Sequence, residues 1–210
     1  MMIIEELVSV SEQLIIQDRL KSSLNCNLIS FFEEMISKNV GRILKDKAIF
    51  FQCDIQTIFQ NRIYKYESVI SVATMMAKLS GIFKIPLLVT EHNSKAFGKT
   101  VQEIQDAYPE GVTLYEKLLF SMMTDDVRGF LKQHPERKSI VLYGVETHVC
   151  VQQTALDLLD AGYNVHILVD GVSSHRIGDR SAGLKRLEQS GAFMTTAESV
   201  AFELVNHAKS

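Results

Sequence analysis

Short, almost wholly apolar runs alternate with longer amphipathic stretches from Lys47 to the end of the chain. The apolar runs predict strands at residues 48–54, 85–90, 112–116, 139–144, 164–170 and 191–195. The amphipathic stretches predict helices at residues 67–83, 123–133, 147–161, 177–189 and 197–207. Strands that are apolar on both faces belong to parallel sheets covered by helices on both sides. The pattern therefore predicts an α/β fold, a Rossmann-like three-layer sandwich with a roughly six-stranded parallel sheet.

The first 46 residues have a different pattern of apolar residues. Their apolar residues recur at mixed three- and four-residue spacing, which predicts one or two amphipathic helices with a break near Asn25–Asn27. No residue in this segment suggests chemistry. We expect residues 1–46 to form an N-terminal helical extension that packs on the main domain, at 47–210, or on another subunit.

Charge and composition argue against several classes of protein. The net charge is −3 and no basic patch stands out, which argues against nucleic acid and anionic membranes as partners. There is no apolar run of about eighteen residues, and the apolar start carries Glu5 and Glu6, unlike a secretory signal. Three cysteines without paired spacing argue against a disulfide framework and against zinc. We expect a cytoplasmic protein with no metal and no cofactor.

Parallel sheets bind ligands beyond the carboxyl ends of their strands, where the strand order reverses. The candidate site residues are therefore those that directly follow the predicted strands. They are Asp54, Thr90 to His92, Glu116 and Lys117, Val145 to Cys150, and Asp170.

Cys150 lies six residues after Gly144, where a predicted strand turns into a helix. The first turn of a helix has unpaired backbone N–H groups and the positive end of the helix dipole, which both favour a thiolate. Such a cysteine can act as a nucleophile, and the same N–H groups can stabilise an oxyanion. A buried cysteine that acts as a small apolar residue fits this position equally well.

Asp54 and Lys117 are candidates of the same kind, each with a simpler alternative. Asp54 ends an apolar strand, where a carboxylate is costly to bury without a partner, and it could take the proton of Cys150. It could also be the N-cap of a following helix. Lys117 could favour the ionised forms of Asp54 and of the thiol, or it could be a solvated surface lysine.

The remaining histidines and Cys53 are weaker candidates. His148 lies two residues from Cys150 on a helix, so the two side chains point to different faces. His92 has no second ligand at suitable spacing, which favours a polar pocket wall over a metal site. His166 is in mid-strand and is predicted to lie in the core or an interface. Cys53 should face away from Asp54 in a strand and is interpreted as structural.

Four segments, in order, resemble the motifs of isochorismatase-like cysteine hydrolases. Asp54–Phe59 resembles the Asp-x-Gln-x-x-Phe element that opens this family, and Gly144–Cys150 resembles its nucleophile turn. Tyr115–Met122 is similar to the Lys-x-x-Phe-Ser segment, and Asp170–Ser174 to the Asp-x-x-Ser-Ser loop. The resemblance runs from about residue 41 to 205 and is strongest to the animal isochorismatase domain-containing proteins.

The resemblance implies a catalytic triad of Asp54, Lys117 and Cys150. Asp54 would be the general base, Lys117 would tune the charge, and Cys150 would attack an amide or a related electrophilic carbon. A cis peptide bond between Val145 and Glu146 is also implied. It would direct the backbone N–H groups of Glu146 and Cys150 into an oxyanion hole.

The resemblance also implies a set of substrate-binding residues and a homo-oligomer, either a dimer or a tetramer. The implied substrate-binding residues are Gln56, Phe59, Glu91, Phe120, Thr147 and Ser174. The sequence departs from the family at His92–Ser94, where relatives have Gln-Tyr-Pro, and at His175, where an arginine is usual. The metal-binding Asp-x-His element of the nicotinamidase branch is absent, which argues against that activity and against a metal.

We therefore expect a hydrolase that cleaves an amide or related C–N or C–O bond of a small molecule through a covalent intermediate on Cys150. One alternative is a catalytically weak or inactive family member that acts as a binding protein, with the N-terminal helices serving a partner. Another is a redox-sensing thiol, against which the lack of a resolving cysteine nearby in the sequence argues.

Overall fold

A computed structural model describes residues 40–207 of the 210-residue chain. The helices predicted in the N-terminal extension lie outside the described residues.

The centre of the described domain is a six-stranded parallel sheet, which confirms the predicted fold class. Its strands are β1 (Ala48–Cys53), β2 (Leu87–His92), β3 (Thr113–Lys117), β4 (Ser139–Val145), β5 (Asn164–Ser173) and β6 (Phe193–Thr195). Their order in the sheet is β3-β2-β1-β4-β5-β6, and every neighbouring pair is parallel. The order reverses between β1 and β4, the position where such sheets bind ligands.

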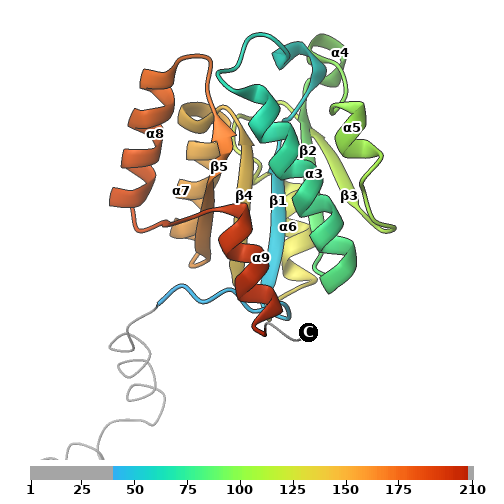
Figure 1. The fold of residues 1–210 in the computed structure, drawn as a ribbon, viewed down its shortest axis with the longest axis vertical. Coiled ribbons are helices and arrows are strands. Elements are labelled where there is room, and N and C mark those ends of the chain that lie inside the picture. Colours follow the sequence, from blue (N-terminus) through green and yellow to red (C-terminus); the bar gives the residue numbers. More distant parts are fainter. Residues whose placement is uncertain (1–39, 208–210) are drawn as a thin grey trace, which may run out of the picture. The chain divides into compact units, whose positions relative to one another are not determined.

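Helices cover both faces of this sheet (Figure 1). Figure 1 shows α3 (Tyr66–Phe83) and α9 (Ala197–Val205) in front of the sheet, with α6 (Asp125–Lys132) and α7 (Gln152–Asp160) behind it. The further helices are η1 (Thr57–Phe59), α4 (Ser94–Phe97), α5 (Gln102–Gln105), the π-helix η2 (Thr147–Val151) and α8 (Ile177–Gln189). Among residues 40–207, no helix has both the length and the hydropathy that crossing a bilayer requires.

The two central strands carry the core. Every residue of β1 and of β4 is buried, because helices pack on both faces of these strands. Phe50, Phe51 and Tyr143 are among the largest side chains with almost no solvent contact. This rigid centre fixes the positions of the residues that follow β1 and β4.

The largest difference from the predicted strand ends is at the fifth strand, because the other five end within two residues of the prediction. The last residue of the fifth strand was expected to be Asp170, which would place its side chain at the ligand-binding edge, but β5 continues to Ser173. The carboxylate of Asp170 instead accepts hydrogen bonds from the backbone N–H of Ala197, at 3.1 and 3.2 Å. Asp170 therefore stabilises the start of α9, since the first N–H groups of a helix have no partner within it.

Candidate active site

The carboxyl ends of the central strands bring Asp54, Lys117 and Cys150 into one region. Asp54 directly follows β1, Lys117 ends β3, and Cys150 lies in η2, directly after the turn from β4. The Nζ of Lys117 lies 2.6 Å from Oδ2 of Asp54, and Asp54 and Cys150 line the same cavity. Residues far apart in the sequence thus meet where the strand order reverses.

Asp54 is buried, and each oxygen of its carboxylate has one hydrogen-bond partner. Its Oδ1 accepts a hydrogen bond from Oγ1 of Thr90 at 2.8 Å, while Oδ2 faces Lys117. The alternative of a helix N-cap does not hold, because the N-cap of η1 is Gln56. Asp54 also has left-handed backbone geometry, with φ of 52°, so the regular alternation of strand side chains ends there.

Lys117 is not a surface lysine. Its ammonium group is inaccessible to solvent and donates to Asp54 and to the carbonyl oxygens of Leu119 and Phe120, at 3.0 and 2.9 Å. Burial acts to lower the pKa of Lys117, but the negative charges around it outweigh burial and the pKa is raised. The lysine therefore remains a cation and balances the buried carboxylate.

Cys150 lies in a helical segment that runs from the π-helix η2 into α7, and only 9% of it is exposed. The cis peptide bond expected between Val145 and Glu146 is present just before this segment. Gly144 has φ of 130°, and a Cβ there would overlap the carbonyl oxygen of Cys53. Only glycine allows β4 to approach β1 this closely immediately before the turn.

Cys53 lies beside Cys150, although the two are far apart in the sequence. Both are free thiols. Burial raises the pKa of the Cys53 thiol well above its usual value, and a hydrogen bond with Cys150 and the charge of Asp54 act in the same direction. A thiol with a raised pKa is rarely a thiolate, so Cys53 is poorly suited to resolve an oxidised Cys150.

A cavity of about 150 Å³ opens onto Cys150. It is lined by Asp54, Phe59, His92, Phe97, Phe120, Val145, Glu146, Val149 and Cys150. The lining includes His92, interpreted from the sequence as a pocket wall, and two of the predicted substrate-binding residues, Phe59 and Phe120. Phe97 was missed, because the four-residue helix α4 is too short to produce a periodic pattern.

Gln56 and Glu91 lie outside this lining and brace the segment that follows β2. Gln56 bonds both the N–H and the carbonyl oxygen of His92, at 2.8 and 3.0 Å. The Glu91 carboxylate accepts from the N–H and hydroxyl of Thr100, at 2.7 and 3.0 Å, and pairs with Lys99. Both side chains are held by partners within residues 92–100, and their contact with a substrate stays a prediction.

Thr147 and Ser174 are also outside the lining. The hydroxyl of Ser174 lies within hydrogen-bond distance of Nδ1 of His148, at 3.0 Å. His148 therefore pairs with Ser174 and not with Cys150, in agreement with the prediction that the two side chains point to different faces. Thr147 is buried, with its methyl group next to Gly183 of α8. His175 holds the Glu146 carboxylate through its backbone N–H at 2.7 Å. These contacts hold the turn between β4 and Cys150 in place.

The described residues contain no group of three or more His, Cys, Asp or Glu side chains that could hold a metal ion.

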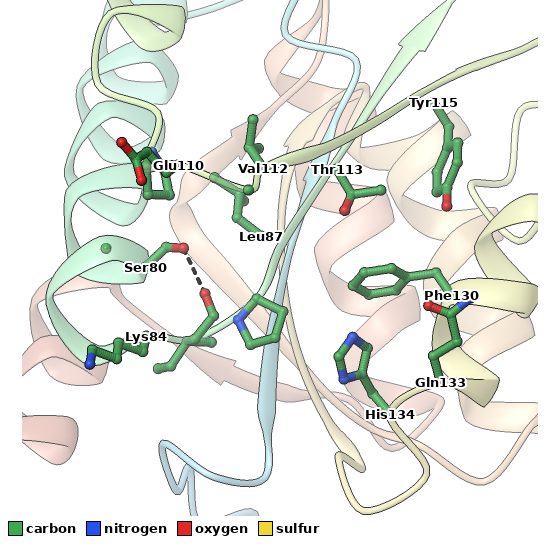
Figure 2. Close-up of a pocket in the computed structure, with 15 residues that line it drawn as sticks. Ser80, Lys84, Leu87, Glu110, Val112, Thr113, Tyr115, Phe130, Gln133 and His134 are labelled. Atoms are coloured by element: carbon green, nitrogen blue, oxygen red, sulfur yellow. Dashed lines mark hydrogen bonds between the residues drawn. The ribbon is translucent and has the colours of Figure 1, made fainter.

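A larger hollow, of about 830 Å³, lies at the opposite end of the strands (Figure 2). It is bordered by Ser80 and Lys84 at the end of α3, by the beginnings of β2 and β3, and by Phe130 and His134 near the end of α6. Figure 2 shows its polar groups spread around the rim, with one hydrogen bond, from Ser80 to the carbonyl of Ile85. The hollow lacks the convergent groups that catalysis needs.

Several known proteins are similar to this chain in sequence and in fold. The isochorismatase domain model matches residues 48–199. Isochorismatase family protein 1A from Dictyostelium discoideum is 43% identical over 175 residues, covering 82% of this chain and 85% of that protein. Isochorismatase domain-containing protein 2 from Xenopus laevis is 38% identical over 172 residues, 82% of each chain. The structure of MAR1 ribonuclease from Caenorhabditis elegans has a TM-score of 0.76 at 35% identity, covering 80% of this chain and 85% of that one.

Proposed function

The chain belongs to the isochorismatase family of hydrolases, and on that premise we propose that it cleaves an amide or related C–N or C–O bond of a small molecule through a covalent intermediate on Cys150. One observation carries this proposal. Asp54, whose carboxylate pairs with the buried Lys117, lines a single small cavity together with Cys150, at the end of the sheet where the strand order reverses. A buried ion pair is costly in free energy, so its place beside a thiol favours a chemical role.

In the first half of the proposed reaction, Asp54 takes the proton of the Cys150 thiol. The sulfur then attacks the carbonyl carbon of the amide, and the backbone N–H groups of Glu146 and Cys150 stabilise the oxyanion. As the C–N bond breaks, the proton on Asp54 passes to the leaving nitrogen. The products of this half are a free amine or ammonia and a thioester on Cys150.

In the second half, water replaces the amine. Asp54 takes a proton from the water, the water oxygen attacks the thioester carbon, and the C–S bond breaks. The proton returns to the sulfur, a carboxylic acid leaves, and the enzyme is restored. Lys117 remains charged throughout and holds Oδ2 of Asp54, which leaves the carboxylate fixed for both proton transfers.

The test is to incubate the protein with a panel of small amides and to measure hydrolysis together with intact mass. We expect a covalent acyl adduct on Cys150 and loss of turnover in Cys150→Ala. Cys53→Ala is the matched control, because it removes the neighbouring free thiol and should leave the adduct on Cys150. Turnover that persists in Cys150→Ala would refute the covalent mechanism.

A binding protein without turnover is the main alternative. The Asp54–Lys117 pair argues against it, because a protein that only binds has no need of a buried charge pair beside a thiol. RNA hydrolysis, which the name of the C. elegans relative attributes to that protein, gains no support here. In the described part of the chain, no Lys or Arg lines the cavity to contact a phosphate backbone.

Quaternary structure and location stay predictions. We expect a dimer or tetramer, which light scattering coupled to gel filtration would test. The side chains of Leu118 and Leu119 are 77% and 60% exposed near the cavity, which supports a contact with another subunit. A cytoplasmic location is expected from the sequence alone.

A further inference from the structure

Two side chains of α7 join the part of the chain that carries Cys150 to the part that follows Lys117. Cys150 lies in η2, which runs directly into α7. Thr154 and Asp157 are three residues apart on α7, so their side chains lie on one face of this helix. Both bond residues between β3 and α6, a stretch at 118–124 that is here called the lysine segment. These contacts lie outside the lining of the active-site cavity.

The hydroxyl of Thr154 forms the first contact. It donates a hydrogen bond to the carbonyl oxygen of Cys150 at 2.6 Å and accepts one from the backbone N–H of Met122 at 2.9 Å. Thr154 and Met122 are both inaccessible to solvent. A helical threonine often bonds the carbonyl four residues earlier, but that bond uses the hydroxyl only as a donor. Here the oxygen also accepts, so one hydroxyl ties the residue with the reactive thiol to the lysine segment.

The carboxylate of Asp157 forms the second contact. Its Oδ2 accepts from the hydroxyl of Ser121 at 2.6 Å, and that hydroxyl accepts from the backbone N–H of Met123 at 3.1 Å. Hydrogen bonds to a carboxylate are stronger than those between neutral groups. The side chains at Ser121 and Met123 are buried, whereas those of Leu118–Phe120 are more than half exposed. The lysine segment is therefore fixed at its buried second half, by α7.

The exposed first half of the segment holds the ammonium group of Lys117. Its Nζ donates to the carbonyl oxygens of Leu119 and Phe120 and to Oδ2 of Asp54. The contacts with α7 begin at the residue after Phe120, so they determine where these carbonyls stand. A shift of the segment would move the carbonyls, with them the ammonium group, and with that the Asp54 carboxylate relative to the sulfur of Cys150.

We propose that Thr154 is a positioning residue, whose hydroxyl sets where the Cys150 thiol stands relative to the Asp54–Lys117 pair. Asp157 supplies the second point of attachment. The proposal rests on the proposed function, because the position matters only if Asp54 takes the proton of the thiol. A displacement of about 1 Å can cost about 10²-fold in rate, so a side chain outside the cavity can have a large effect.

Alkylation of Cys150 by iodoacetamide, followed across pH by peptide mass spectrometry, tests this role without a substrate. Thr154→Val keeps the shape of the side chain but neither donates nor accepts, whereas Thr154→Ser keeps both abilities. We expect Thr154→Val to react about tenfold more slowly at pH 7, because Asp54 is no longer placed to take the proton. At about pH 10 the thiol ionises without Asp54, so this variant and the wild type should react alike. Thr154→Ser should match the wild type throughout.

Thr74→Val is the matched control. Thr74 is also a helical threonine, in α3, and its hydroxyl has no hydrogen-bond partner among the described residues. This variant should leave the alkylation profile of Cys150 unchanged. Equal rates for the wild type and Thr154→Val at pH 7, or a slowing that persists at pH 10, would overturn the proposal.

A loss of folding gives a different signal. Cys53 is fully buried, so its alkylation reports opening of the domain. If Thr154→Val exposes Cys53, the second point of attachment decides. Ser121→Ala removes the bond to Asp157 and should slow alkylation of Cys150 at pH 7 by about two- to fivefold. An unchanged profile in that variant would overturn the proposal.

Failure of this proposal and failure of the proposed function give different results. If an amide is hydrolysed, Thr154→Val should lower kcat and leave KM nearly unchanged, because Thr154 does not line the cavity. Undiminished kcat in Thr154→Val would refute the role of Thr154 and leave the hydrolase standing. Slower alkylation at pH 7 without hydrolysis of any amide would refute the hydrolase and leave the role of Thr154 standing.

Discussion

Of the two hollows at opposite ends of the sheet, the smaller one holds the reactive side chains. The hollow at the amino ends of β2 and β3 has about 830 Å³ and the cavity at the carboxyl ends has about 150 Å³. The small cavity holds a free thiol and part of a buried ion pair, whereas the large hollow holds polar groups that do not converge. The reactive groups therefore lie at the carboxyl ends of the strands, although the hollow there is the smaller one.

The difference has a physical origin in the parallel sheet. At the carboxyl ends, the chain leaves each strand toward a helix N-terminus, so unpaired N–H groups and strand-end side chains point into a common space. At the amino ends, helix C-termini arrive and lie near groups that already have partners, as Ser80 does with the carbonyl of Ile85. Variants at each end of the sheet test this difference separately.

The largest effect is expected from Asp54→Asn at the carboxyl end. The amide cannot accept the thiol proton, so turnover of an amide substrate should fall by about 10²- to 10⁴-fold. Steady-state hydrolysis and intact mass would be measured together, with Gln133→Ala from the other hollow as the control. Undiminished turnover in Asp54→Asn would eliminate the proposed base.

Removing the cation should act chiefly on stability. Lys117→Met leaves the Asp54 carboxylate buried without its charge partner, which should lower the free energy of unfolding by about 3–5 kcal/mol. Urea denaturation measures this value. The matched control is Lys99→Met, which breaks a pair of 3.1 Å with Glu91 in which the lysine side chain is 68% exposed. Its effect should be about 0–1 kcal/mol, because an exposed pair is screened by water. Similar losses in the two variants would mean that the Asp54–Lys117 pair is not effectively desolvated.

His166 of β5 should make the stability of the fold sensitive to acid. Burial lowers the pKa of His166, which stacks on Phe193, from 6.5 to about 4. The unfolded chain therefore binds a proton on this histidine between these pH values while the folded protein does not, and stability falls as the pH drops from 6.5 to 4. This residue should cost about 2–3 kcal/mol at pH 4.5 and nothing above about pH 7.

Urea denaturation at pH 7 and at pH 4.5 would measure the loss in the wild type and in His166→Gln, which cannot titrate. The variant should lack this part of the acid-induced loss. An equal loss in both proteins would place the acid sensitivity at other groups.

The sequence predicted the sheet, the helices around it and the strand ends to within two residues, except for the end of β5. Buried strands produce strong local patterns, and the order of the motifs carries the resemblance to a family. Side-chain direction was less predictable. Asp54 has a left-handed backbone, and Cys53 lies beside Cys150, so simple alternation does not describe the end of β1. The partners of Gln56 and Glu91 were harder still to predict, because the course of residues 92–100 determines them.

The end of β5 shows a second limit. The run of apolar residues stops at Asp170, which looks like a strand end, but β5 continues past it while its register against β4 shifts between Leu142 and Gly144. The step from Leu142 to Gly144 in β4 corresponds to the longer step from Ile167 to Val172 in β5, so β5 itself carries the extra residues of a bulge. The contact of Asp170 with the start of α9 is tertiary, so the local sequence does not reveal it.

The smallest effect is expected from filling the larger hollow. Thr113→Phe adds a ring at the beginning of β3, where the side chain is half-buried and has room in front of it. Turnover should stay within about twofold and the free energy of unfolding within about 0.5 kcal/mol, as for a surface change away from the core. The matched change at the other end is Val149→Phe, which places a ring of the same size in the small cavity and should block turnover. If Thr113→Phe reduced turnover as strongly as Val149→Phe, the hollow at the amino ends would have to be coupled to the thiol, and the contrast between the two ends of the sheet would no longer explain where the chemistry lies.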